Sequence, residues 1–167
     1  MICYVSTAWN IRNYDENWQT KSANLQHQSE FKLFSDTITQ SNKDILKLLN
    51  YNVEDITITD MWANVLKPGE SHPPHTHSNN FLSGVYYLYS DRNAGIIFSD
   101  PRPASDVIVP RKKEKTLDNS NLVTYASKTN RAIMFPAWLV HWVPINKSTK
   151  NRISISWNIQ LKGQLGE

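Results

Sequence analysis

The sequence predicts a mainly β fold, an antiparallel sandwich or jelly roll, on the basis of three observations. Apolar and polar residues alternate along much of the chain after position 55, which is typical of strands with one buried face. Asn, Asp, Gly and Pro interrupt these runs at short intervals, as turns between strands do. Helical periodicity occurs only before position 55, so helices and strands do not alternate as they would in a parallel α/β fold.

The helical signal lies in residues 29–50, where apolar residues recur at helical spacing. Ser41 and Asn42 near its middle indicate a break, so we expect one or two amphipathic helices packed on one sheet. The first strand should follow at residues 55–66 and end at the turn Pro68-Gly69. Its residues expected on one common face are Ile56, Ile58, Asp60, Trp62, Asn64 and Leu66. Further strands are expected at residues 81–89, 95–98, 122–126, 131–135, 138–143 and 152–161.

Length and composition indicate one domain. The chain has 167 residues, of which 40% are hydrophobic, enough for one core, and it contains no repeat or long linker. We expect a single domain over residues 1–167. It should have a helical N-terminal part over about residues 1–54 and a β-barrel core over about residues 55–162.

Charge and cysteine content favour a cytoplasmic protein. No apolar run approaches the roughly 18 residues of a membrane span, so no membrane partner is expected. The single cysteine, Cys3, cannot form an intramolecular disulfide, which fits a reducing compartment. The net charge is +3, and the one basic tract, residues 111–115, also contains Glu114. Such a tract is typical of a solvated loop and does not predict nucleic-acid binding.

Three of the five histidines, His72, His75 and His77, follow the Pro68-Gly69 turn within a few residues. Side chains two residues apart in an extended strand point to the same face, so His75 and His77 can reach one metal ion. The alternative is a polar surface loop, because Pro73-Pro74 disfavours regular structure.

His141 lies far downstream in an apolar, tryptophan-flanked segment. A lone histidine in such a strand is usually a buried core residue, but the upstream His-x-His pair makes metal ligation the better interpretation. Imidazole nitrogens suit divalent iron among other transition metals. The pattern therefore predicts a metal site of His75, His77 and His141. Downstream, Arg152 carries a planar guanidinium suited to a carboxylate, unless it is simply an exposed strand residue.

Seven segments occur in a specific order along the chain. They are Pro68-Gly69, His75-x-His77, SGVYYL at residues 83–88, GIIF at residues 95–98, DPR at residues 100–102, FPxWLxH at residues 135–141 and RISISWN at residues 152–158. In this order they resemble the iron(II)- and 2-oxoglutarate-dependent oxygenases. The resemblance covers about 100 residues and is greatest to a small bacterial and phage group with an SGVYYL strand. Prolyl hydroxylases are more distantly similar.

This resemblance implies a double-stranded β-helix (jelly roll) that binds Fe(II) and uses 2-oxoglutarate as co-substrate. His75 and His141 match the first and the distal metal ligand, and Arg152 matches the residue that binds the far carboxylate of 2-oxoglutarate. Tyr87 and Ser154 are further expected contacts of that carboxylate, with Ser156 as the alternative to Ser154. The implied reaction hydroxylates a substrate and releases succinate and carbon dioxide.

The sequence departs from the family pattern at position 77, where an acidic ligand is expected. We predict His77 as the third ligand because it lies two residues after His75. Three neutral imidazoles leave an Fe(II) site at a charge of +2 and favour an anionic co-substrate. The alternatives are that Asp100 or His72 reaches the metal, or that only two histidines bind it.

Two other functional classes stay open. The spacing of Gly69 to His75-x-His77 and of Pro136 to His141 resembles the cupin motif, but the cupin glutamate is absent from residues 80–82. The third interpretation is a non-catalytic jelly-roll protein with a structural metal such as zinc.

The substrate class follows from none of these motifs, so a small molecule and a peptidyl group both stay open. The resemblance places the chain in the cytoplasm of a bacterium or of a phage-infected host, and its size is compatible with a homodimer. The long segment of residues 102–121 is expected to act as a lid or a substrate contact. Four aromatic residues are expected to wall the pocket: Trp62, Phe81, Trp138 and Trp142.

Overall fold

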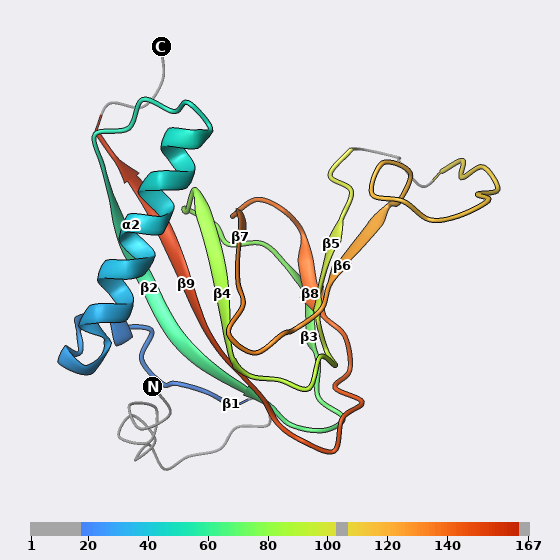
Figure 1. The fold of residues 1–167 in the computed structure, drawn as a ribbon, viewed down its shortest axis with the longest axis horizontal. Coiled ribbons are helices and arrows are strands. Elements are labelled where there is room, and N and C mark those ends of the chain that lie inside the picture. The colour runs from blue at the N-terminus through green and yellow to red at the C-terminus, as the bar shows by residue number, and fades with distance from the viewer. Residues whose placement is uncertain (1–17, 103–106, 164–167) are drawn as a thin grey trace.

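Two antiparallel sheets face each other in the computed structural model, which describes residues 18–102 and 107–163 (Figure 1). The larger sheet has the strand order β1-β2-β9-β4-β7, and the smaller has the order β3-β8-β5-β6. Strands distant in sequence are neighbours in both sheets, as in a jelly roll. This architecture confirms the predicted mainly β fold with a helix packed on one sheet.

The strand and helix bounds agree with most of the predicted segments. Two elements were not among the predicted strands, β1 and β3, and β8 begins later than expected. The larger sheet contains Trp18–Gln19 (β1), Asp55–Leu66 (β2), Leu82–Tyr89 (β4), Ala132–Pro136 (β7) and Arg152–Lys162 (β9). The smaller sheet contains His72–His75 (β3), Ile96–Ser99 (β5), Leu122–Tyr125 (β6) and His141–Val143 (β8). The helical elements are the 3-10 helices Leu25–His27 (η1) and Ser29–Phe31 (η2) and the α-helix Lys32–Leu48 (α2).

Helix α2 runs without interruption through Ser41 and Asn42, so the expected break at these residues is wrong. Asn42 is fully buried, and its side-chain amide donates a 2.8 Å hydrogen bond to the carbonyl oxygen of Ile38. This bond to the preceding turn gives the amide a partner inside the helix, so the asparagine does not need to leave it.

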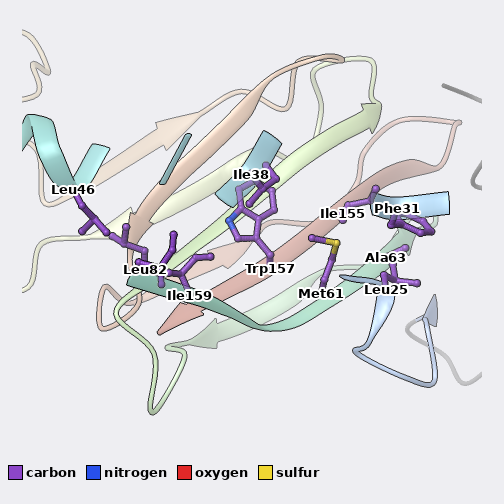
Figure 2. Packing of buried hydrophobic residues seen from close by; sticks show 11 residues of the cluster. Leu25, Phe31, Ile38, Leu46, Met61, Ala63, Leu82, Ile155, Trp157 and Ile159 are labelled. Carbon is purple, nitrogen blue, oxygen red and sulfur yellow. The ribbon is translucent and has the colours of Figure 1, made fainter. Parts of the chain in front are cut away.

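The main core lies between α2 and the outer face of the larger sheet (Figure 2). Trp157 of β9 is fully buried at its centre, and the ring of Phe34 from α2 meets it edge-on at a centroid distance of 6.1 Å. Packing of this face leaves the other face of the same sheet, which looks toward the smaller sheet, available for polar side chains. The buried residues of the cluster are Leu25, Phe31, Ile38, Leu46, Ile56, Met61, Ala63, Leu82, Ile155, Trp157 and Ile159.

Strand β2 contains an irregularity that exchanges its two faces. Its register with β9 shifts between Ile58 and Asp60, and one extra residue reverses the alternation of side chains. As a result, Ile56 and Ile58 belong to the core beneath α2, whereas Trp62 and Asn64 face the smaller sheet. The expected common face is therefore wrong for the two isoleucines.

Gly84 of β4 is required by the neighbouring strand, because a Cβ at this position would overlap ring atoms of Trp157. We expect Gly84→Ala to lower the free energy of unfolding by about 2 kcal/mol, since the ring is fully buried and cannot move aside without strain. Urea denaturation measures this loss. An unchanged midpoint would contradict the tight contact between the two strands.

Some predictions for the segments outside the two sheets are not tested by the structure. Residues 1–17 lie outside the described part of the chain, so the N-terminal part expected over residues 1–54 is described only from residue 18. Residues 107–121 form no helix or strand and extend beyond the smaller sheet (Figure 1). Their predicted role as a lid or substrate contact, and the single-domain division, stay predictions. Within the described ranges, no helix is long and apolar enough to cross a membrane.

Candidate metal centre

A cavity of about 400 Å³ lies between the two sheets. Strands β2 and β9 contribute one wall, and β3 and β8 contribute the opposite wall. The cavity collects most of the polar side chains predicted to be functional. Its polar lining includes Asn64, His72, His75, His77, His141, Arg152, Ser154 and Ser156.

The structure brings His75, His77 and His141 together, with one ring nitrogen of each within 4.8 Å of the others. Strands β3 and β8 pair so that His75 lies opposite His141, and the two ring centroids are 4.4 Å apart. His77 lies two residues beyond the end of β3, where its backbone N–H donates a 2.9 Å hydrogen bond to the carbonyl oxygen of Ala137. Its Nε2 atom is 3.3 Å from Nε2 of His141.

The orientation of two of these rings is set by the backbone. Nδ1 of His75 lies 2.8 Å from the carbonyl oxygen of Pro73, and Nδ1 of His141 lies 2.8 Å from the carbonyl oxygen of Leu139. A neutral imidazole that donates its Nδ1 proton to a carbonyl keeps the Nε2 lone pair free. Both rings therefore present a metal-binding nitrogen toward the cavity.

Burial keeps two of the imidazoles neutral. It lowers the pKa of His77 from 6.5 to about 4, and positive charge on the neighbouring histidines would act in the same direction. Burial also lowers the pKa of His141 to about 4, although the hydrogen bond to Leu139 opposes this shift. Only an unprotonated imidazole can bind a metal, so neutral rings are ready to act as ligands near pH 7.

The three histidines differ in exposure: His75 is exposed, His77 is half-buried and His141 is buried. The cavity is therefore open to solvent on the side of His75 and closed behind His141. The residues that close it include Phe135, whose ring centroid lies 4.6 Å from that of His141. Trp62 lies on the other side, 5.9 Å from the ring of His77.

Neither of the other candidates for the third ligand joins the group of three histidines. Asp100 forms an ion pair with Arg102 at an N–O distance of 2.5 Å and does not line the cavity. His72 does line the cavity but is not part of the group of three. In the described ranges, no acidic side chain joins that group. The geometry therefore favours His77 over both alternatives.

Arg152 is a buried cation that forms no ion pair with the described residues. Its side chain is 3% exposed, and its Nη1 donates a 3.2 Å hydrogen bond to Oγ of Ser154. Its guanidinium carbon lies 4.8 Å from the ring centroid of Tyr87. Nε of Arg152 and the hydroxyl of Tyr87 are both buried, and neither makes a hydrogen bond of good geometry to residues 18–102 and 107–163. The two side chains nevertheless interact with each other, and this interaction opposes the effect of burial on the pKa of each group. Tyr87 itself does not line the cavity. No carboxylate from the same residues forms an ion pair with Arg152.

Such an arrangement is unfavourable unless an anion occupies the cavity, because a buried charge needs a partner. Burial lowers the pKa of Arg152 and raises the pKa of Tyr87, so desolvation opposes the charged form of both groups. A bound carboxylate would accept hydrogen bonds from both and offset this cost.

The cavity has two distinct ends. Ser156 of β9 lies opposite Trp62, which is beside His77, whereas Arg152 starts the same strand four residues earlier. Four residues of strand span about 13 Å, and the long arginine side chain reaches back along part of that distance to Ser154. The three histidines therefore lie near one end of the cavity, and the guanidinium lies near the other end.

Sequence reasoning missed Asn64, which is 5% exposed and donates a 3.2 Å hydrogen bond to Oγ of Ser156. It also overestimated the aromatic wall, because Trp62 is the only one of the four expected aromatic residues that lines the cavity. Trp138 lies in the turn before β8 and is 60% exposed. Phe81 packs at the edge of the helix-side core.

The expectation for Trp142 also failed, for a reason of strand geometry. It lies between His141 and Val143, which both line the cavity, so its side chain points to the opposite face of β8. Phe135 of β7 takes the place that was expected for a tryptophan, and only the pairing of the sheets shows this.

Comparison with known proteins gives one family. Residues 60–158, more than half of the chain, match the family model described as "Putative 2OG-Fe(II) oxygenase". No curated protein matches the chain in sequence.

Several solved structures are similar in fold. A prolyl-4-hydroxylase from Pseudomonas putida superposes with a TM-score of 0.61 at 14% identity, covering 97% of this chain and 83% of that one. The non-heme alpha-ketoglutarate-dependent epimerase SnoN from nogalamycin biosynthesis gives 0.63 at 12% identity, covering 94% and 70%. An oxidoreductase of the 2OG-Fe(II) oxygenase family from Burkholderia pseudomallei gives 0.53 at 13% identity, covering 82% and 55%.

At these identities the structural similarity supports the fold alone, and this chain spans just over half of the Burkholderia protein. The structures similar to this chain include a hydroxylase and an epimerase, so the fold does not specify the reaction. The sequence match over residues 60–158, supported by the jelly roll and the group of three histidines, shows that the chain belongs to the 2OG-Fe(II) oxygenase family.

Proposed function

We propose that this chain is an Fe(II)- and 2-oxoglutarate-dependent dioxygenase that hydroxylates a substrate and releases succinate and carbon dioxide. One observation carries the proposal. A group of three histidines and a buried guanidinium, which pairs with no carboxylate of the described residues, face the same cavity of about 400 Å³. A small diacid with a metal-chelating keto-acid end and a distant carboxylate would satisfy both groups at once.

In this proposal His75, His77 and His141 hold the metal. Imidazole nitrogens suit Fe(II), and three protein ligands leave further coordination positions for other molecules. The bound iron supplies the chemistry that couples dioxygen and the oxidative decarboxylation of 2-oxoglutarate to the insertion of one oxygen atom into a C–H bond of the substrate.

In this proposal, residues in and beside the cavity bind and orient 2-oxoglutarate. Arg152 and the hydroxyl of Tyr87 donate hydrogen bonds to the far carboxylate of 2-oxoglutarate, and Ser154 supports the guanidinium from behind. Holding that carboxylate directs the keto-acid end toward the histidines, which fixes the orientation of the co-substrate before the reaction. Phe135 and Trp62 line the cavity near the histidines and exclude water from this side.

The two alternative classes receive less support. A cupin site uses a glutamate beside its histidines, and no acidic side chain of the described residues joins this group. A purely structural metal would leave the buried charge of Arg152 without a partner. The substrate, small or peptidyl, a homodimeric state and a cytoplasmic location stay predictions.

The decisive experiment is anaerobic absorption spectroscopy. Fe(II) followed by 2-oxoglutarate should give the visible charge-transfer band of an iron-chelated keto acid. Protein loaded with Zn(II), which has no such transition, is the matched control. Iron-loaded protein without the band after saturation with 2-oxoglutarate would reject the assignment.

Replacement of His77 tests the departure from the usual acidic ligand. We expect His77→Ala to weaken Fe(II) binding by more than about 10-fold, since mutation of a residue that only hydrogen-bonds to a metal ligand already has an effect of that size. His77→Asp should bind Fe(II) much better than His77→Ala, because a carboxylate restores a ligand. Anaerobic titration against a competing chelator measures both, and equal affinities for wild type and His77→Ala would remove His77 from the metal site.

A further inference from the structure

His72 is a fourth histidine in the cavity that the metal group does not include. It is half-buried at the start of β3. Within the part of the chain that the structure describes, its ring makes no hydrogen bond to another residue. A ring that lines a cavity in this way can interact with a molecule bound there.

An irregularity of β3 turns His72 into the cavity. His72 lies opposite Val143 and His75 lies opposite His141, with a register shift between the two pairs. Paired residues of an antiparallel ladder share a face, and residues 141 and 143 share a face because they are two apart. His72 and His75 therefore point the same way although they are three residues apart, which a regular strand would not allow.

The same end of the cavity contains Arg152. Val143, the partner of His72, packs with Leu66, and Leu66 lies opposite Arg152 in the pairing of β2 with β9. The charge of Arg152 also contributes to the lowered pKa of His72, which is about 4 mainly because of burial. His72 and Arg152, whose buried Nε–H has no acceptor among the described residues, therefore line the same end of the cavity from facing sheets.

We infer that His72 donates a hydrogen bond to the far carboxylate of the 2-oxo acid, so that Arg152 and His72 hold this carboxylate from opposite sheets. The inference rests on the proposed function. In this arrangement His72 contacts the co-substrate directly and favours a 2-oxo diacid over a 2-oxo monoacid. A hydrogen bond to a charged group contributes about 10-fold or more to affinity.

Binding of two 2-oxo acids to Mn(II)-loaded protein tests the inference by isothermal titration calorimetry. Pyruvate has the metal-chelating end of 2-oxoglutarate but lacks the far carboxylate. We expect His72→Ala to weaken 2-oxoglutarate about 10-fold while leaving the affinities for pyruvate and for Mn(II) unchanged. His72→Gln, which keeps an N–H donor, should recover part of the loss, and the exposed His27→Ala is the matched control.

Each other outcome overturns the inference. Unchanged binding of 2-oxoglutarate would show that His72 makes no contact with it. Equal weakening of both acids, or a loss of Mn(II) affinity, would instead assign His72 to the metal or to the fold. Failure of the wild-type protein to bind 2-oxoglutarate would be a failure of the proposed function, and it would be seen before any variant is compared.

Discussion

The His141→Ala variant is expected to lose Fe(II) binding and all co-substrate turnover. His141 is 3% exposed, and its strand is hydrogen-bonded on both sides, to β3 and to β5. Its ring lies close to both other members of the group, at centroid distances of 4.4 Å from His75 and 5.1 Å from His77. Removing it should weaken Fe(II) binding by at least about 100-fold, since mutation of a residue that only hydrogen-bonds to a metal ligand can already reach that size.

Bound iron after anaerobic gel filtration and decarboxylation of 2-oxoglutarate measure this effect. His27→Ala changes an exposed histidine outside the cavity and should behave as wild type. The His141→Ala protein should remain folded, because a neutral ring is removed and no buried charge loses its partner. Stoichiometric iron in folded His141→Ala would contradict the proposed metal site.

The Arg152→Met variant should lose affinity for 2-oxoglutarate by about 100-fold and keep its affinity for Fe(II). Charge-assisted hydrogen bonds to a carboxylate are about twice as strong as neutral ones, and methionine supplies none of them. Arg152→Lys keeps the charge but lacks the planar fork of donors, so we expect an intermediate loss. Arg92→Met, at an exposed position that does not line the cavity, is the matched control.

Stability separates binding from folding in this experiment. Without ligand, Arg152→Met should be no less stable than wild type, because an unpaired buried cation costs free energy that methionine does not. Saturating 2-oxoglutarate should raise the melting temperature of metal-loaded wild type and not that of the variant. Parallel losses of iron, 2-oxoglutarate and stability would show that Arg152 has a role in folding instead.

The strands of this protein could be predicted because their signals are local. Alternation of apolar and polar residues and the intervening turn residues place β2, β4 and β9 almost at their observed bounds. The helix break was predicted wrongly for the opposite reason. Asn42 is a poor helix residue by itself, and its buried hydrogen bond to Ile38 appears only once the helix is packed.

The side-chain faces were predicted less well than the strands. Alternation assigns faces correctly only along a regular ladder, and both β2 and β3 contain register shifts. The first shift moves Ile56 and Ile58 into the helix-side core. The second shift, in β3, brings His72 into the cavity beside His75. Simple alternation along the strand would place these two side chains on opposite faces.

The sequence by itself determined the chemistry of the candidate site: which imidazoles, which guanidinium and which phenol are present, and their order along the chain. Only the tertiary structure decided that His75 lies opposite His141 and that Arg152 is buried with no ion pair to residues 18–102 and 107–163. The physical reason is that residue types and local periodicity are properties of neighbouring residues. Register, burial and convergence arise from hydrogen bonds and packing between strands that the chain brings together from distant positions.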